Sequence, residues 1–186
     1  MIALKQYKCL KYSIFSNGIY KIVPIRFEDR FHIMKWRNEQ IYHLRQSKPL
    51  TESDQNNYFN NTIPNLFEEI NPKQILFSFL ENNKCIGYGG LVHINWIDRN
   101  AEISFIMDTK LEKKHFYDYW TIFLGLIENL ASCELFLHKL YVYAFDLRPH
   151  LYDVLINNNY YFEAKLNQHC FYEDKYIDVI IHSKII

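Results

Sequence analysis

The chain has 186 residues and a formal net charge of zero, because 21 Lys and Arg residues balance 21 Asp and Glu residues. Its hydrophobic content of 49% fits one folded domain over residues 1–186 with a sizeable core. The basic excess that is typical of nucleic-acid-binding proteins is missing. No run of about 18 apolar residues predicts a membrane span. We therefore expect neither a nucleic acid nor a membrane as a partner.

Cysteine and histidine spacing argues against a metal site. Cys9, Cys85, Cys133 and Cys170 are far apart in the chain, and no zinc-binding or CxxC spacing occurs. The apolar surroundings of Cys85 and Cys133 are typical of reduced core thiols, which favours the cytoplasm over an oxidising compartment. Residues 1–11 carry lysines without a long apolar run, so we expect no secretory signal.

The first half of the chain predicts two short helices between strands. An Asn17-Gly18 turn precedes a first strand at 20–25, and residues 1–16 could add an N-terminal edge strand. Helical spacing of apolar residues predicts a helix over 28–38. The sequence Thr51-Glu52-Ser53-Asp54 has the capping pattern that begins a second helix. Strands are then expected at 74–80 and 84–96, joined by a turn at Asn82-Asn83.

The second half predicts a strand at 101–107, a long helix, and a closing set of strands. The long helix is expected to begin near Phe116, because apolar residues from there to Leu130 follow the i, i+3, i+4, i+7 pattern. A strand at 140–145, a helix from Pro149 to about 157 and strands at 160–166 and 176–182 complete the order. We interpret this order as an α/β (α+β) domain with helices on both faces of a mixed sheet.

This order resembles the GNAT superfamily of N-acetyltransferases, as do several local stretches. Residues 22–26, Cys85-Ile86-Gly87 and Ala101 to Phe105 look like the first, third and fourth strands of that family. The stretch from Val154 to Tyr160 is similar to the L-x-x-x-G-F ending of its last helix, with Asn159 in the glycine place. The resemblance implies a mostly antiparallel central sheet of six to seven strands with about four helices. It also implies acetyl-CoA as co-substrate and no metal.

The resemblance implies that acetyl-CoA binds where strand 101–107 leads into the long helix. The backbone of Phe105, Ile106 and Met107 would hold the pantetheine arm. Free N–H groups and the positive end of a helix dipole would attract the diphosphate. The glycines of the family pattern Q/R-x-x-G-x-G/A are replaced here by His115 and Tyr117, and Glu112 stands at its first position. The expected coenzyme contacts are therefore Phe105, Ile106, Met107, Lys113, Lys114, His115, Phe116 and Tyr117.

Three residues are candidates for the chemistry. A Glu at the place of Glu102 serves many GNAT enzymes as general base, and the alternative is a strand-edge carboxylate that pairs with Arg99. His93 on the neighbouring strand is a second candidate base, or a structural histidine. Tyr152 in the last helix lies near the place of the tyrosine that protonates the departing thiolate. With 15 tyrosines in the chain, chance placement is the alternative.

The acceptor is expected at the first helix. The segments Lys35-Trp36-Arg37-Asn38 and Leu44-Arg45-Gln46 resemble a GNAT subgroup that acetylates amino-sugar nucleotides and is related to enzymes that acetylate protein N-termini. Guanidinium groups can hold phosphates bidentately, and an aromatic ring can stack on a base. The expected acceptor-binding residues are Trp36, Arg37, Asn38, Arg45, Gln46 and Trp96.

Together these features predict an N-acetyltransferase that moves an acetyl group from acetyl-CoA to the primary amine of a small molecule, here a nucleotide-linked amino sugar. The alternatives are a protein N-terminal acetyltransferase and a degenerate GNAT-fold binding protein without activity. The glycine-free turn motivates the second alternative. The protein could also form a homodimer.

The glycines of Gly87-Tyr88-Gly89-Gly90 do not match a dinucleotide-binding fingerprint, and we expect them to permit a bulge or a close approach of substrate.

Overall fold

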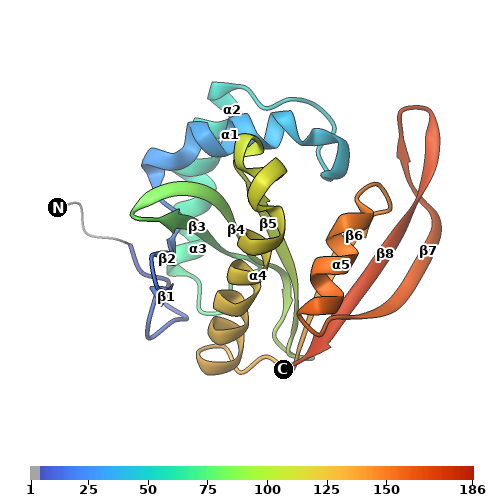
Figure 1. Cartoon of the computed structure of the whole chain (residues 1–186). Coiled ribbons are helices and arrows are strands. Elements are labelled where there is room, and N and C mark those ends of the chain that lie inside the picture. The colour runs from blue at the N-terminus through green and yellow to red at the C-terminus, as the bar shows by residue number, and fades with distance from the viewer. Residues whose placement is uncertain (1–4) are drawn as a thin grey trace.

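The computed structural model describes residues 5–186, and all structural statements below concern those residues. Eight strands form one sheet in the order β1-β2-β3-β4-β5-β6-β8-β7. All neighbours pair antiparallel except β5 and β6, which are parallel. In Figure 1, α4 and α5 run in front of this sheet, and the β7–β8 hairpin forms its right-hand edge. The predicted mixed, mostly antiparallel GNAT sheet is confirmed, with one strand more than the upper expectation.

The N-terminal part begins with a hairpin and continues into helices. Strands β1 (Phe15–Asn17) and β2 (Tyr20–Pro24) turn at Gly18, whose φ of 60° suits a glycine. The edge strand expected within residues 1–16 is therefore only β1, and residues 1–4 of that prediction lie outside the described part. The helical segments that follow are η1 (Phe27–Asp29), α1 (Arg30–Glu39), η2 (Ile41–His43), α2 (Glu52–Asn57), η3 (Tyr58–Thr62) and α3 (Ile63–Glu68).

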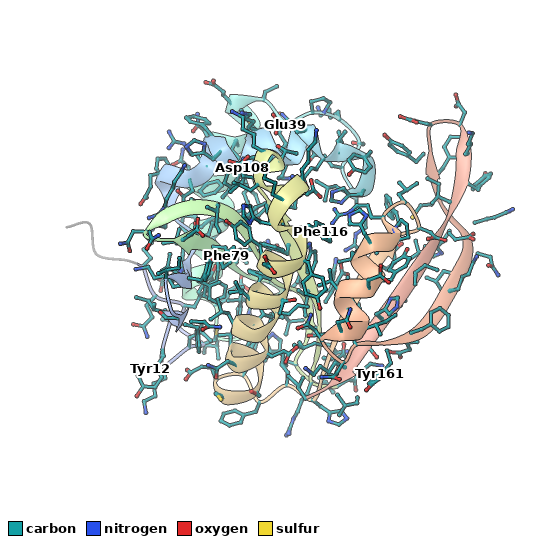
Figure 2. The ribbon with its side chains drawn as sticks, viewed as in Figure 1. Tyr12, Glu39, Phe79, Asp108, Phe116 and Tyr161 are labelled. Carbon is teal, nitrogen blue, oxygen red and sulfur yellow. The ribbon has the colours of Figure 1, made fainter. Side chains whose placement is uncertain are left out.

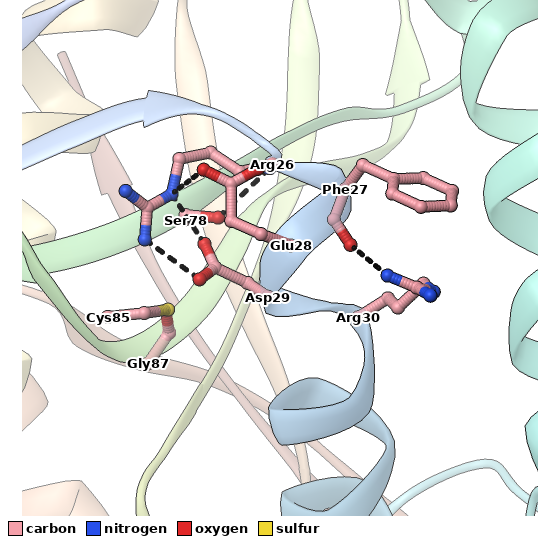
Figure 3. Close-up of polar contacts among 8 residues, drawn as sticks. All are labelled: Arg26, Phe27, Glu28, Asp29, Arg30, Ser78, Cys85 and Gly87. Atoms are coloured by element: carbon pink, nitrogen blue, oxygen red, sulfur yellow. Dashed lines mark hydrogen bonds and ion pairs between the residues drawn. The ribbon is translucent and has the colours of Figure 1, made fainter. Parts of the chain in front are cut away.

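A buried ion pair sets the junction between β2 and α1. Arg26 donates two hydrogen bonds to the carboxylate of Asp29, at 2.7 and 2.8 Å (Figure 3). The backbone N–H of Arg26 donates to Ser78 Oγ on β3 at 3.1 Å, which ties the junction to the sheet. Further along, Thr51 caps α2 with the reciprocal capping box that its sequence predicts. The Arg26–Asp29 pair and the bond to Ser78 anchor the start of α1 to the sheet.

Close packing of backbones, not substrate, explains the glycines of the central strand β4 (Lys84–Asn95), which pairs with β3 (Ile75–Glu81). A Cβ added to Gly89 would lie 2.1 Å from the carbonyl oxygen of Ser104, and one added to Gly90 would lie 2.0 Å from that of Ile75. The neighbouring strands can approach β4 this closely only because Gly89 and Gly90 have no side chain. The expected bulge lies beside Gly87, where the partners in β3 shift by one residue between Cys85 and Gly87, and a second irregularity follows between Val92 and Asn95.

The predicted start of the long helix is wrong. Helix α4 spans Thr109–Cys133 and follows directly on β5 (Asn100–Met107), with Asp108 as its N-cap. The expected turn at residues 113–117 is therefore helix interior, where backbone N–H groups are used by the helix itself. Apolar periodicity starts late because the first two turns of α4 are mostly polar. The apolar face packs on the sheet, and the rings of Phe105 and Phe123 stack at 4.1 Å.

Strands β5 and β6 (Lys139–Phe145) pair over only three positions, Asn100–Glu102 with Lys139–Tyr141. Beyond Glu102 the two strands separate, and each leads into a helix, α4 or α5 (Pro149–Asn157). Asn159 follows α5 with a φ of 63°, which confirms the left-handed position predicted for it. The chain closes with β7 (Tyr161–Tyr172) and β8 (Lys175–Ile185), both longer than expected.

Candidate active site

A cavity of about 1140 Å³ opens where β5 and β6 separate, and we call it the splay cavity. Its walls combine both strands with the ends of several helices. The residues used below are, from α1 and the loop after it, Arg37, His43 and Arg45; from β4, Tyr88 and His93; from β5, Glu102 to Phe105; and from β6 and α5, Tyr143 and Arg148. A polar patch on apolar walls with several ionisable groups is typical of an active site.

Glu102 lies in the wall of the splay cavity at the last position where β5 pairs with β6. It is only 5% exposed. Arg45 Nη2 donates a hydrogen bond to Glu102 Oε1, so the expected alternative of pairing with Arg99 is replaced by a pair with Arg45. Burial raises the pKa of the Glu102 carboxyl, and the nearby Arg45 opposes that rise. A carboxylate with a raised pKa is a stronger base than an ordinary surface carboxylate.

His93 lies beside this carboxylate, as the sequence predicts. Its Nε2 is 3.9 Å from Glu102 Oε2. The residue has a φ of 51° within the irregular part of β4 between Val92 and Asn95. The His93 side chain is 60% exposed, and burial together with Arg45 lowers its pKa. His93 is therefore a largely exposed imidazole, uncharged at neutral pH, beside the buried carboxylate.

Tyr152 is not among the residues that line the splay cavity. Its hydroxyl donates a hydrogen bond to Asp146 Oδ1 at 2.9 Å, and its ring stacks on His182. Tyr58, Tyr88 and Tyr143 do line the cavity, and of these Tyr143 on β6 lies nearest the Arg45–Glu102 pair, with its ring 4.6 Å from the guanidinium carbon of Arg45. Burial raises the pKa of Tyr143 to about 12, so its hydroxyl is protonated at neutral pH.

The expected acceptor residues divide into two groups. Arg37 and Arg45 line the splay cavity, and Arg37 Nη1 donates to the Tyr88 hydroxyl at 2.5 Å. Asn38 and Gln46 serve the loop instead: the Asn38 side chain exchanges hydrogen bonds with the backbone of Leu50. Gln46 accepts from Arg37 Nε and donates to Asn38. These two amides hold the loop after α1 in shape.

Neither expected tryptophan lines the splay cavity. Trp36 is 3% exposed and its ring stacks with that of His32, so no face of the ring is free to stack on a base. Trp96 donates its indole N–H to the carbonyl of Pro72 at 3.0 Å. The apolar residues whose spacing predicted helix α1 form the face that the helix buries, and Trp36 is one of them. Its place in the core accounts for a tryptophan here without any ligand.

Of the expected coenzyme contacts, Phe105 lines the splay cavity. The carbonyl of Met107 accepts a hydrogen bond from the buried Gln40 at 2.9 Å. Lys113 and Lys114 are exposed on α4, and the rings of His115 and Phe116 pack against Tyr119 and His150 respectively. Tyr117 is 47% exposed. No residue from 113 to 117 lies in the cavity wall.

The sequence did not reveal three of the cavity residues, Tyr143, His43 and Arg148. Arg148 is 6% exposed, and its Nη1 lies 2.5 Å from His43 Nε2. Its position directly before Pro149, at the end of an apolar strand, is the one signal that could have drawn attention to it. No local sequence pattern identifies His43 or Tyr143 as site residues. Tyr143 reaches the cavity because β6 separates from β5, and His43 reaches it because the segment after α1 folds back over the cavity.

The cavity and its residues can accommodate acetyl-CoA. The separated strands leave room beside β5, and the buried guanidinium of Arg148 offers a positive charge to a phosphate.

None of the helices formed by residues 5–186 has the length and apolarity that crossing a bilayer requires.

Comparison with known proteins agrees with this geometry. The family model described as "Acetyltransferase (GNAT) domain" matches residues 22–181. Among curated proteins, none matches this chain. A crystal structure of spermidine N-acetyltransferase from Vibrio cholerae in complex with CoA and spermine is similar with a TM-score of 0.79 and 18% identity. The match covers 91% of this chain and 96% of that one.

Two further structures show the same fold. Mutant forms of the spermidine/spermine N-acetyltransferase from Vibrio cholerae match with a TM-score of 0.74 and 19% identity, over 91% of this chain and 95% of that one. A probable acetyltransferase matches with a TM-score of 0.73 and 16% identity, over 92% and 96%. At these identities the likeness shows the fold, and the family model carries the assignment. The chain belongs to the acetyltransferase (GNAT) domain family and is an acyl-CoA N-acyltransferase with acetyl-CoA as its co-substrate.

Proposed function

We propose that the chain acetylates the primary amine of a small molecule and that Glu102 is the general base. The observation that carries this proposal is the buried Glu102 carboxylate in the wall of the splay cavity, at the point where β5 and β6 separate. An amine bound there must lose a proton as its nitrogen bonds to the acetyl carbon. Glu102 would accept that proton, and His93 at 3.9 Å would pass it to solvent.

The remaining groups of the cavity complete the transfer. Acetyl-CoA, when bound, supplies the thioester whose carbon–sulfur bond breaks. The edge of β5 beyond Glu102, which has no paired neighbour in β6, would hold the pantetheine arm. Tyr143, rather than Tyr152, would donate the proton that the departing sulfur takes up, because Tyr143 lines the cavity and its hydroxyl is protonated at neutral pH.

The charge of the splay cavity supports an acceptor that carries an acidic group beside its amine. Arg37, Arg45, Lys73 and Arg148 line it against the two carboxylates of Asp54 and Glu102. In the Arg45–Glu102 pair, opposite charges already stand side by side. An acceptor could replace both partners, with its ammonium on Glu102 and its acid on Arg45. Nucleotide-linked amino sugars fit this description, although the buried Trp36 removes the stacking contact first expected for them.

A polyamine is the second candidate acceptor. The solved structures with the same fold include spermidine N-acetyltransferases, and one of them holds spermine. The cavity charge argues against this candidate, because each added ammonium would approach Arg37 and Arg45. Bringing like charges together in a partly buried site is unfavourable. A peptide N-terminus is a third acceptor, and it offers no acid to Arg45 unless the peptide itself carries one.

A panel of acceptors tests the proposal. Release of the CoA thiol is measured with acetyl-CoA and either a UDP-linked 4-amino-sugar, spermidine or a neutral peptide with a free N-terminus. We expect kcat/KM to be highest for the anionic amino sugar. Efficient turnover of spermidine alone would overturn the acceptor class and leave the reaction intact. If no amine of any charge is acetylated, the proposed reaction itself is wrong.

A further inference from the structure

Arg148 is a buried guanidinium with no carboxylate partner. It is 6% exposed, it lines the splay cavity, and its Nε has no hydrogen-bond partner in the structure. Among residues 5–186, no Asp or Glu lies within ion-pair distance of it. Burying a charge without a counter-charge is costly. The protein therefore keeps a buried guanidinium in a place that offers it no counter-charge.

The neighbours of Arg148 hold the guanidinium in place without neutralising it. The guanidinium carbon lies 5.2 Å from the centroid of the Phe116 ring, and Nη1 contacts His43 Nε2. Burial and the charge of Arg148 lower the pKa of His43 to about 3, so that its imidazole is neutral and accepts the hydrogen bond. Glu112 on α4 offsets part of the charge from a distance. A positive charge thus remains available to the cavity.

The start of α4, where the family places the diphosphate, is already occupied by acids of this chain. Asp108 Oδ1 accepts a hydrogen bond from the backbone N–H of Lys110 at 3.0 Å. Glu39 accepts a hydrogen bond from the hydroxyl of Thr109, and Glu112 lies in the first turn. Figure 2 shows Glu39 and Asp108 close together at this end of α4. Lys35 pairs with Glu39, but Asp108 already takes up a free N–H of this helix start and Glu112 adds negative charge there, which makes it a poorer diphosphate site than a glycine turn.

The start of α5 has the opposite character. It carries Arg148 at the N-cap, Pro149 in the first turn and no side-chain cap, and it contains no acid in its first turn. The positive end of the α5 dipole therefore adds to the charge of Arg148. Both lie just beyond the last residue of β6, at the end where β5 and β6 have separated.

We propose that Arg148, with the uncapped start of α5, binds the diphosphate of acetyl-CoA in this chain, in place of a glycine-bearing turn before α4. A guanidinium presents its N–H groups as a planar fork that matches two phosphate oxygens. The diphosphate supplies the counter-charge that Arg148 lacks. This inference rests on the proposed function in one respect, which is that acetyl-CoA is the acyl donor.

Calorimetry with shortened ligands tests which part of the coenzyme Arg148 contacts. The probes are CoA, 4′-phosphopantetheine and pantetheine, which carries no phosphate. We expect Arg148→Met to weaken CoA binding at least about tenfold and to leave pantetheine binding unchanged. Arg148→Lys keeps the charge without the fork, and its affinity should fall between the two. An equal loss for CoA and pantetheine, or no loss for CoA, would overturn the proposal.

Matched controls separate this site from α4. Lys113→Met and Lys114→Met remove exposed charges near the alternative site, and each should change CoA affinity less than about twofold. Loss of CoA binding in these two variants but not in Arg148→Met would assign the diphosphate to α4. If the wild-type chain binds neither CoA nor its fragments, the acyl donor itself is wrong, which is a different failure.

Thermal unfolding without ligand gives an independent readout. Removing a buried charge that has no partner should raise the midpoint Tm of Arg148→Met by a few degrees. A purely structural arginine would instead lower Tm when removed. A variant with raised Tm and weakened CoA binding supports the proposal, and a variant with lowered Tm and unchanged CoA binding contradicts it.

Discussion

Arg45 donates a hydrogen bond to Glu102 although the two residues lie 57 positions apart in the chain. The same guanidinium lies over the ring of Tyr143 at 4.6 Å. The loop after α1 is thereby joined to β5 and to β6 at the place where those strands separate. Because the Arg45 side chain is 44% exposed and that of Glu102 only 6%, the charge around the candidate base depends on a side chain that solvent and ligands can reach.

Replacing the candidate base should abolish most of the activity. We expect Glu102→Gln to lower kcat by about 10²–10⁴ and to leave CoA affinity unchanged, because the amide cannot accept a proton. Initial rates and calorimetry measure the two quantities. Asp98→Asn in the turn before β5 is the matched control and should retain wild-type kcat. A small effect of Glu102→Gln with a large effect of His93→Ala would make His93 the base.

Arg45→Met should move the acid limb of the pH profile of kcat/KM to higher pH. A general base works above its pKa, and Arg45 lowers the pKa of Glu102, so its removal lets burial raise that pKa further. The control is Arg99→Met, which removes a guanidinium from the turn before β5 that sequence alone paired with Glu102. If the acid limb of the pH profile shifts in Arg99→Met and not in Arg45→Met, the Arg45–Glu102 ion pair does not set the pKa of Glu102 in solution.

His43 should make the fold less stable in acid. Its pKa falls from the ordinary 6.5 to about 3 on folding, so the unfolded chain takes up a proton below about pH 6.5 that the folded chain does not. The free energy of unfolding should therefore decrease by up to about 1.4 kcal/mol per pH unit between about pH 6.5 and 3. Urea unfolding at several pH values measures this slope.

The matching variant is His43→Gln, which cannot be protonated and should reduce that slope by about one proton. His32→Gln on α1 is the control, since it removes an imidazole without touching Arg148. An unchanged slope in His43→Gln would mean that His43 is not the buried acid-sensitive group.

Gly89→Ala should destabilise the fold, since its Cβ would lie 2.1 Å from the Ser104 carbonyl oxygen. Forcing a methyl group into such a contact costs typically about 1–3 kcal/mol. Gly125→Ala on α4 is the matched control, because its Cβ would meet no atom within 4 Å. That change should stabilise α4 by roughly 0.5–1 kcal/mol. Similar losses in both variants would contradict the close approach of β4 and β5.

Trp36→Phe tests the corrected role of that residue. Because Trp36 is 3% exposed, the change should lower the free energy of unfolding by leaving unfilled space in the core. The KM for the acceptor should stay within about twofold of wild type, because the ring reaches no part of the splay cavity. A large rise in KM with unchanged stability would return Trp36 to the acceptor site.

Local chemistry made much of the fold predictable. Asn82 and Asn83 both adopt positive φ in the predicted turn between β3 and β4, and Asn159 does so after α5. Thr51 and Asp54 form the predicted capping box. Each of these depends on a few adjacent residues, so the sequence contains the whole cause. The start of α4 was missed because the polar turn Thr109–Glu112 has no apolar periodicity, although Asp108 could have been recognised as an N-cap.

The sequence by itself determined the order of helices and strands, the family resemblance and the placement of Glu102 and His93 on neighbouring strands. Only the tertiary structure decided which cation meets Glu102, that Trp36 and Tyr152 lie outside the splay cavity, and that Arg148 and Tyr143 lie inside it. His43 and Arg148 are 105 positions apart. Such contacts depend on where strand pairing stops and where a loop returns, and these are properties of the whole sheet that no local pattern encodes.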